Sequence, residues 1–148
     1  MKLYLAGSCA AEQRSLMKGI AKELRKAGYE VYCPFELKIP NAWDYTQEEW
    51  ARLVFEADIK AIDKSDAVIV ITPGRIGSAG TNFEQGYAYA KGKHVLAFQY
   101  TNEPTSLMTY CGCDTFLNVY ESAQVIAGLL IERLKRHDMS GQCLTTLT

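Results

Sequence analysis

The stretch that decides the fold is Ala67-Val-Ile-Val-Ile-Thr72, followed by Pro73-Gly-Arg-Ile-Gly77 and then by Ser78-Ala-Gly-Thr-Asn-Phe-Glu-Gln-Gly-Tyr-Ala-Tyr-Ala90. An unbroken apolar run is typical of a strand that a parallel sheet buries on both faces. The glycines let the loop turn sharply and let a ligand approach the backbone. We expect a helix next, with Thr81 or Asn82 as its N-cap. Ligands of open α/β sheets bind beyond the carboxyl ends of the strands, so this order predicts a binding edge.

Glu84 is the residue of chemical interest in this stretch. A helix that starts at Thr81 or Asn82 places Glu84 in the first turn, where the helix dipole favours an acidic side chain for structural reasons alone. The neighbourhood favours a functional interpretation, because two glycines precede Glu84 and Gly86 follows it. A carboxylate that only stabilises the start of a helix does not need glycines on both sides of it.

Composition narrows the functional classes. The chain has 148 residues, 48% of them hydrophobic and 22% charged, which is ordinary for one globular domain. A net charge of -1 does not indicate nucleic acid or an anionic membrane as partner, and no apolar run is long enough to span a bilayer. The five cysteines match neither a disulfide framework nor a zinc pattern. We therefore expect a cytoplasmic protein with reduced thiols and no metal or cofactor.

Strand and helix patterns alternate along the rest of the chain. We expect further strands over residues 2–6, 29–33, 93–98 and 115–119, and further helices over residues 12–27, 46–63 and 121–136. Long irregular connections are expected over residues 35–45 and 99–112. The alternation predicts an α/β fold: a flavodoxin-like or Rossmann-like doubly wound sheet of five parallel strands, flanked by helices. Residues 1–137 form the expected domain, and residues 138–148 a flexible C-terminal tail.

Four segments, in this order along the chain, resemble the nucleoside 2-deoxyribosyltransferase family. They are Tyr4-Leu-Ala-Gly7, Glu56-Ala-Asp-Ile-Lys-Ala-Ile62, Ser65-Asp-Ala-Val-Ile69 and Gly80-Thr-Asn-Phe-Glu-Gln-Gly-Tyr-Ala88. The last segment is fairly specific, and the similarity runs from Lys2 to the C-terminal helix. The family includes 2′-deoxynucleoside 5′-monophosphate N-hydrolases, which share the fold and the nucleophile. The resemblance therefore implies an enzyme that breaks an N-glycosidic bond.

Three residues match family positions of known role. Glu84 matches the catalytic glutamate, which would attack the anomeric carbon of a 2′-deoxyribosyl group, displace the base and hold the sugar covalently, until a second base or water releases it with net retention. Tyr4 matches a tyrosine whose hydroxyl holds that glutamate. Asp58 matches an aspartate that contacts the base and helps pass it a proton, which requires a raised pKa. We expect Glu84 to stay ionised at its helix N-terminus, where its charge would stabilise the positive transition state.

The resemblance also implies substrate contacts, and one of them departs from the transferases. Six residues before the nucleophile, similar transferases carry an aspartate that binds the sugar 5′-hydroxyl, whereas this chain has Ser78. The monophosphate hydrolases have a serine there, because a carboxylate would repel a phosphate; an ordinary loop serine is the structural alternative. Ser106 resembles a hydrolase serine that reaches a neighbouring subunit's phosphate, while Gly80-Thr81 is more like a transferase. The implied substrate contacts are Gly7, Ser8, Ser78, Gly80, Ser106 and Met108.

Three functions follow from these observations. The first is a 2′-deoxyribosyltransferase that moves deoxyribose from a deoxynucleoside to another free base. The second is a hydrolase that releases base and deoxyribose 5-phosphate from a deoxynucleotide. The third is a non-catalytic nucleotide-binding domain, because fold alone does not fix function. Similarity to the family also implies a homo-oligomer, a dimer or an assembly of dimers, in which a neighbour completes each active site.

Overall fold

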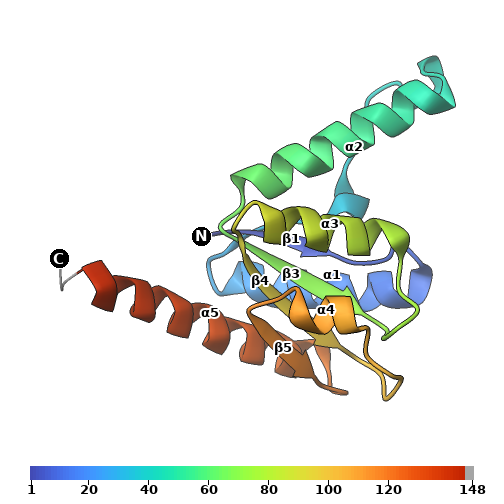
Figure 1. Cartoon of the computed structure of the whole chain (residues 1–148). Coiled ribbons are helices and arrows are strands. Elements are labelled where there is room, and N and C mark those ends of the chain that lie inside the picture. The colour runs from blue at the N-terminus through green and yellow to red at the C-terminus, as the bar shows by residue number, and fades with distance from the viewer. Residues whose placement is uncertain (146–148) are drawn as a thin grey trace.

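A computed structural model describes the backbone of residues 1–145 and the side chains of residues 1–138. In these residues the elements are β1 (Lys2–Ala6), α1 (Ala11–Lys26), β2 (Glu30–Tyr32), α2 (Gln47–Lys64), β3 (Ala67–Thr72), α3 (Ala79–Ala90), β4 (His94–Gln99), α4 (Leu107–Cys111), β5 (Thr115–Asn118) and α5 (Ala123–Thr145) (Figure 1). Two short 3-10 turns, Pro34–Glu36 and Ala42–Asp44, interrupt the connection before α2. No helix in the described part of the chain is long and apolar enough to cross a membrane.

Within the described residues the strands form one sheet in the order β2-β1-β3-β4-β5, and every neighbouring pair is parallel. This is the flavodoxin-like order, so the predicted doubly wound fold is confirmed. The chain reverses direction across the sheet between β1 and β3, and ligands of such folds bind at that switch point. β2 lies at one edge of the sheet.

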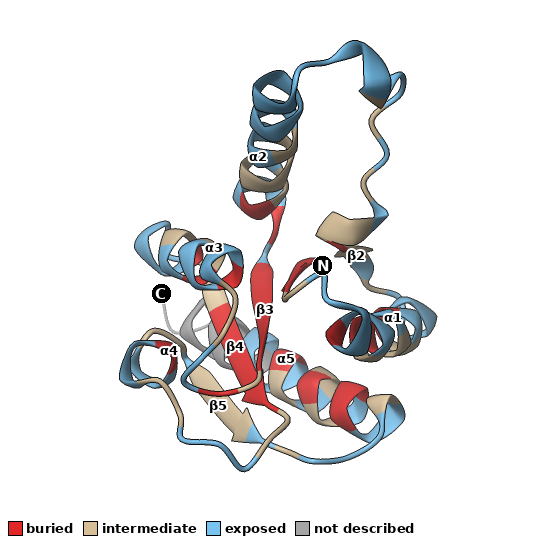
Figure 2. Ribbon diagram, turned by 90° about the vertical axis from the view of Figure 1, so that its right-hand side faces the viewer, coloured by how far each residue is buried: buried red, intermediate tan, exposed pale blue. Residues whose placement is uncertain are grey.

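Alternate residues of the strands pack on opposite faces of the sheet. One face carries Leu3, Leu5, Ile69, Ile71, Leu96 and Phe98, which pack against α1 and α5. The other face carries Tyr4, Ala6, Val68, Val70, Val95 and Ala97, which pack with residues of α2 and α3. β3 is buried along its whole length, as its unbroken apolar run predicts (Figure 2). The second face, the one with Tyr4, is the face on which the site is built.

The helix α2 contributes little to this core. Thr46 and Glu49 form a capping box at its start. Of its residues, all of which the structure describes, only Ile62 near the C-terminal end is buried. The helix extends past the body of the sheet (Figure 1), and its apolar Trp50 and Phe55 are 44% and 53% exposed.

The structure differs from the sequence predictions in three places. α3 begins at Ala79 with Ser78 as N-cap, not with Thr81 or Asn82, because the Ser78 hydroxyl accepts the Thr81 N–H at 3.4 Å. The connection after β4 contains α4, which is too short to show a helical period in the sequence. α5 continues to Thr145, through most of the predicted tail, and residues 146–148 lie outside the described part.

Candidate active site

Two elements bring Tyr4 and Glu84 together at the centre of the sheet. Tyr4 is fully buried in β1, beside β3, and α3 follows β3 directly. The Tyr4 hydroxyl donates a hydrogen bond to Oε1 of Glu84 at 3.0 Å. Oε2 of Glu84 is buried and has no hydrogen-bond partner among the described residues. A nucleophile needs a carboxylate with one oxygen held by a hydrogen bond and the other free to attack, and Glu84 has this arrangement.

A second tyrosine–carboxylate pair lies beside the first. Tyr32 of β2 donates a hydrogen bond to Oδ1 of Asp58 on α2 at 2.9 Å. Tyr4 and Tyr32 are opposite each other in the register of β1 and β2, and their rings stack with centroids 5.4 Å apart. The stack therefore links Glu84 and Asp58, which the sequence predicted as site residues, through neighbouring strands. Tyr32 was not among the predicted site residues, because its role depends on cross-strand register.

Burial sets the protonation of both carboxyl groups. Loss of water raises the pKa of Glu84 from 4.5 to about 7; the hydrogen bond from Tyr4 lowers it, and the negative charge of Asp58 raises it further. The pKa of Asp58 is also raised by burial, against the hydrogen bond from Tyr32 that lowers it. The raised pKa that a proton donor requires is thus present at Asp58.

The expectation that Glu84 stays ionised is corrected by this environment. α3 begins at Ala79, so Glu84 lies in the second helical turn and not in the first. The helix dipole acts mainly within the first turn, and burial outweighs it at Glu84. At neutral pH the Glu84 carboxyl therefore exchanges between its neutral and ionised forms.

Asp58 and Glu84 line one cavity of about 370 Å³ between α2 and α3. Gly80, a predicted contact, lines the same cavity, and the remaining lining residues are apolar: Trp50, Ala51, Val54, Phe55, Ile59 and Phe83. Phe55 and Phe83 contact each other with ring centroids 5.8 Å apart. An apolar, aromatic wall facing two carboxyl groups suits a flat heterocycle bonded to a polar sugar. This wall was not predicted, because a helical period in a sequence does not distinguish exposed apolar residues from core residues.

The loop after β1, which carries the predicted contacts Gly7 and Ser8, is fixed by a buried glutamine. Gln13 of α1 accepts the Ser8 N–H at 3.1 Å and donates to the carbonyl oxygen of Ile71 at 2.8 Å. A Cβ atom on Gly7 would lie 2.7 Å from Sδ of Met17, so any larger residue there would displace the buried Met17 side chain. The structure thus gives Gly7 a packing role and holds the Ser8 backbone at the carboxyl edge of the sheet.

Ser78 has a structural task as the N-cap of α3. Its oxygen accepts a hydrogen bond from the helix, and its own hydroxyl hydrogen stays available for another acceptor. In the same helix, Oγ1 of Thr81 is buried without a hydrogen-bond partner among the described residues. The first turn of α3 therefore offers hydroxyl and backbone donors but no carboxylate.

Ser106 and Met108 lie apart from the two carboxyl groups within this chain. Both line a different cavity of about 530 Å³ between α3 and α4. Ser106 is the N-cap of α4, and Met108 is 79% exposed. α4 is tied to α3 by buried Gln85, whose Nε2 donates to the carbonyl oxygens of Thr109 and Gly112, both at 2.9 Å. One chain alone does not bring Ser106 or Met108 to Glu84.

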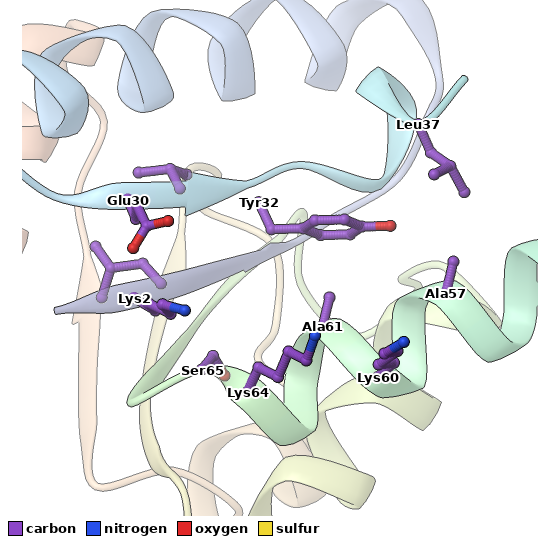
Figure 3. A pocket seen from close by; sticks show the side chains of 11 residues that line it. Lys2, Glu30, Tyr32, Leu37, Ala57, Lys60, Ala61, Lys64 and Ser65 are labelled. Atoms are coloured by element: carbon purple, nitrogen blue, oxygen red, sulfur yellow. The ribbon is translucent and has the colours of Figure 1, made fainter. Parts of the chain in front are cut away.

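A third cavity, of about 480 Å³, borders another side of α2 (Figure 3). It is lined by Lys2, Leu3, Glu30, Val31, Tyr32, Leu37, Ala57, Lys60, Ala61, Lys64 and Ser65. Glu84 and Asp58 are not among these lining residues. Tyr32 connects this cavity to the site through its hydrogen bond to Asp58. Among the residues with described side chains, no group of three or more His, Cys, Asp or Glu is arranged to hold a metal ion.

Comparison with known proteins yields one family and several solved structures. The profile of the family described as nucleoside 2-deoxyribosyltransferase matches residues 3–139. A 2-deoxyribosyltransferase from Bacillus psychrosaccharolyticus is 27% identical, with 86% of this chain and 90% of that chain covered and a TM-score of 0.71. No curated protein sequence matches the chain.

Two further solved structures share the fold at lower identity. The CMP N-glycosidase BcmB of Clostridium botulinum is 19% identical, with 87% of this chain and 98% of that chain covered and a TM-score of 0.63. A conserved protein from Enterococcus faecalis V583 is 21% identical, with 90% and 98% covered and a TM-score of 0.62. At these identities the likeness concerns the fold alone.

Proposed function

Because the chain belongs to the nucleoside 2-deoxyribosyltransferase family, we propose that it cleaves the N-glycosidic bond of 2′-deoxyribonucleosides and transfers the deoxyribose to another base. Membership makes it an enzyme of the N-glycosyl transferase and N-glycosidase class. The observation that supports deoxyribosyl transfer is the pair of carboxyl groups, Glu84 and Asp58, in one cavity. Each carboxyl group is held by a tyrosine hydroxyl. The substrates are a deoxynucleoside and a free base, and the proposed chemistry uses no cofactor.

Glu84 is the proposed nucleophile. An oxygen of its carboxylate attacks the anomeric carbon of the deoxyribosyl group, the bond to the base breaks, and a covalent deoxyribosyl–Glu84 ester forms. Oε2, buried and without a partner, supports this role, while Tyr4 holds Oε1. The transition state is positive at the sugar, so the ionised form of Glu84 stabilises it. Attack of a second base on the opposite face releases Glu84 with overall retention.

Asp58 is the proposed proton donor to the leaving base. An anionic purine or pyrimidine is a poor leaving group, so a proton must reach the base as the bond breaks. The raised pKa of Asp58 supports this role, because a larger share of the carboxyl keeps its proton near neutral pH. When the second base attacks, the Asp58 carboxylate takes a proton back from it. The proposed reaction thus needs Glu84 ionised and Asp58 protonated.

A product assay by chromatography tests this proposal. The protein is incubated with deoxynucleosides plus a different free base and, in parallel, with the matching 5′-monophosphates. A new deoxynucleoside in the first set supports the transferase. Glu84→Ala and Glu84→Gln should abolish its formation, and a variant that keeps most of its rate would overturn the role of Glu84. Absence of any product from either set would favour the non-catalytic alternative.

Ser78 supports one alternative, a 2′-deoxynucleoside 5′-monophosphate N-hydrolase. The first turn of α3 has hydroxyl and backbone donors and no acidic side chain, so it would not repel a phosphate. Free base and deoxyribose 5-phosphate from the second substrate set would establish this alternative. The Ser8 hydroxyl would then be a further donor to the phosphate, because the Ser8 backbone N–H already donates to Gln13.

We propose that the enzyme works as a homo-oligomer, a dimer or an assembly of dimers, with shared active sites. Apolar side chains stand exposed on α2 and on α4, where Leu107 is 74% exposed. Exposed apolar surface of this kind is typical of protein interfaces. A second copy would also supply Ser106 and Met108, which one chain does not bring to its own Glu84. Size-exclusion chromatography with light scattering tests this, and a monomer at micromolar concentration would contradict it.

A further inference from the structure

Tyr32 repeats, one strand away, what Tyr4 does for Glu84. The two tyrosines are register partners on β2 and β1, so both side chains leave the sheet on the same face. Their rings are 19° from parallel, and each hydroxyl ends at one carboxyl group of the site, Glu84 for Tyr4 and Asp58 for Tyr32. The two hydrogen bonds differ by 0.1 Å in length. The sheet therefore delivers one phenol donor to each of the two reacting carboxyl groups.

The Tyr32 ring packs against the core of the second face of the sheet on one side and borders a cavity on the other. Figure 3 shows Tyr32 extending from β2 above the side of α2 that carries Ala57 and Ala61. These small side chains leave a cavity of about 480 Å³ beside the ring. Tyr32 is half-buried, whereas Tyr4 is fully buried. Besides its packing against the core of that face, the ring stack with Tyr4 and the hydrogen bond to Asp58 orient Tyr32, and the same hydrogen bond orients Asp58.

We propose that Tyr32 is a positioning residue of the reaction, whose hydroxyl holds Oδ1 of Asp58 so that the other oxygen faces the leaving base. This inference rests on the proposed role of Asp58 in proton transfer. Asp58 lies on α2, the helix that extends from the body of the protein and has few core contacts of its own. The bond from β2 therefore ties the proton donor to the rigid sheet that also carries Tyr4.

The hydrogen bond also acts on protonation. The titratable groups that face Asp58 are Tyr32 of β2, Tyr4 of β1 and Glu84 of α3. Donation by Tyr32 favours the ionised form of Asp58 and lowers its pKa, against the burial that raises it. Without the Tyr32 hydroxyl, the pKa of Asp58 must rise. A tyrosine that acted only through the packing of its ring would leave that pKa unchanged.

The test compares Tyr32→Phe with Tyr87→Phe as a matched control. Phenylalanine keeps the ring stack and removes only the hydroxyl. Tyr87 also donates to an aspartate of α2, Asp63, at 2.7 Å, but that exposed pair is not in the cavity of Glu84. Titration of ¹³C-labelled carboxyl groups by NMR should show the pKa of Asp58 rising by about one pH unit in Tyr32→Phe. Tyr87→Phe should leave it unchanged. This readout needs no turnover, so it stands even if the proposed reaction is wrong.

Kinetics then test whether Tyr32 acts through Asp58. Tyr32→Phe should lower kcat about tenfold, the effect of one lost charged hydrogen bond, and should move the basic limb of the pH profile upward. In an Asp58→Asn background the same change should have less than a twofold effect, because the acceptor carboxylate is gone. An unchanged pKa of Asp58 would overturn the proposal, and so would equal losses from Tyr32→Phe with and without Asp58.

Discussion

Glu84→Gln should make the protein more stable at alkaline pH while abolishing its activity. In the folded protein the pKa of Glu84 lies at about 7, against an ordinary value of 4.5, and burial is the main cause. Folding thus favours the protonated carboxyl. Its stabilising contribution is complete below pH 4.5 and is lost as the pH rises towards 7, so above neutrality the folded protein keeps a charge that burial disfavours. Glutamine keeps an acceptor for Tyr4 and carries no charge.

The size of the effect follows from the pKa values. A rise of about 2.5 pH units, at about 1.4 kcal/mol each, corresponds to roughly 3 kcal/mol of folding free energy at pH 8. For a domain of this size that difference raises Tm by roughly 6–12 °C. At pH 4 the two proteins should be nearly equal, because Glu84 is then protonated in the folded and the unfolded state.

Urea denaturation of wild type and Glu84→Gln between pH 4 and pH 9 measures this difference directly. The two curves of unfolding free energy against pH should coincide at acid pH and separate between pH 4.5 and 7, with the variant above. Curves that run parallel over the whole range would refute the reasoning, because Glu84 would then have an ordinary pKa. The same preparations, assayed for deoxyribosyl transfer, should show that the more stable protein is inactive.

Three further predictions concern single side chains around the site. Tyr4→Phe removes the donor that lowers the pKa of Glu84, so the acid limb of the rate profile should move to higher pH and the loss of rate should be larger at pH 6 than at pH 8. Gln85→Leu leaves the buried carbonyl oxygen of Thr109 in α4 and the part-buried one of Gly112, the C-cap of α4, without their donor, and should lower the unfolding free energy by about 2–4 kcal/mol in urea; a change within experimental error would show that α4 does not depend on it. Ser78→Asp keeps an N-cap but adds a charge, so it should reduce turnover of monophosphates far more than of nucleosides; equal losses on both would mean that Ser78 does not contact a phosphate.

The sequence was sufficient for the sheet because its signals are strong and local. The apolar run of β3 and the breaks on either side of it predict a buried parallel strand, and that element is confirmed to the residue. The start of α3 was predicted too late in the sequence. Ser78, Thr81 and Asn82 are all good N-cap residues, and which of them caps the helix depends on the path of the preceding loop. α4 has five residues, too few for a period of 3.6 to be visible.

The site was less predictable because it depends on contacts between distant residues. Family resemblance supplied Tyr4, Asp58 and Glu84, and the structure brings them together. Tyr32 requires knowledge of the register between β1 and β2, which no local pattern gives. The pKa of Glu84 depends on how deeply the second turn of α3 is buried, and a sequence does not report burial of a polar residue.

In the proposed mechanism, access of water would decide whether a deoxyribosyl ester at Glu84 is transferred or hydrolysed. The cavity of Asp58 and Glu84 has an apolar wall on α2, but Trp50 and Phe55 in that wall are 44% and 53% exposed. A wall that solvent reaches from outside excludes water poorly until an apolar surface covers it. The acceptor base could stack on this wall, or a second copy of the chain could cover α2. Either arrangement would keep water away from the ester and so favour transfer over hydrolysis. Trp50→Ala should therefore raise the ratio of hydrolysis to transfer, whereas a ratio that stays constant as total rate falls would mean that α2 binds the base without controlling water.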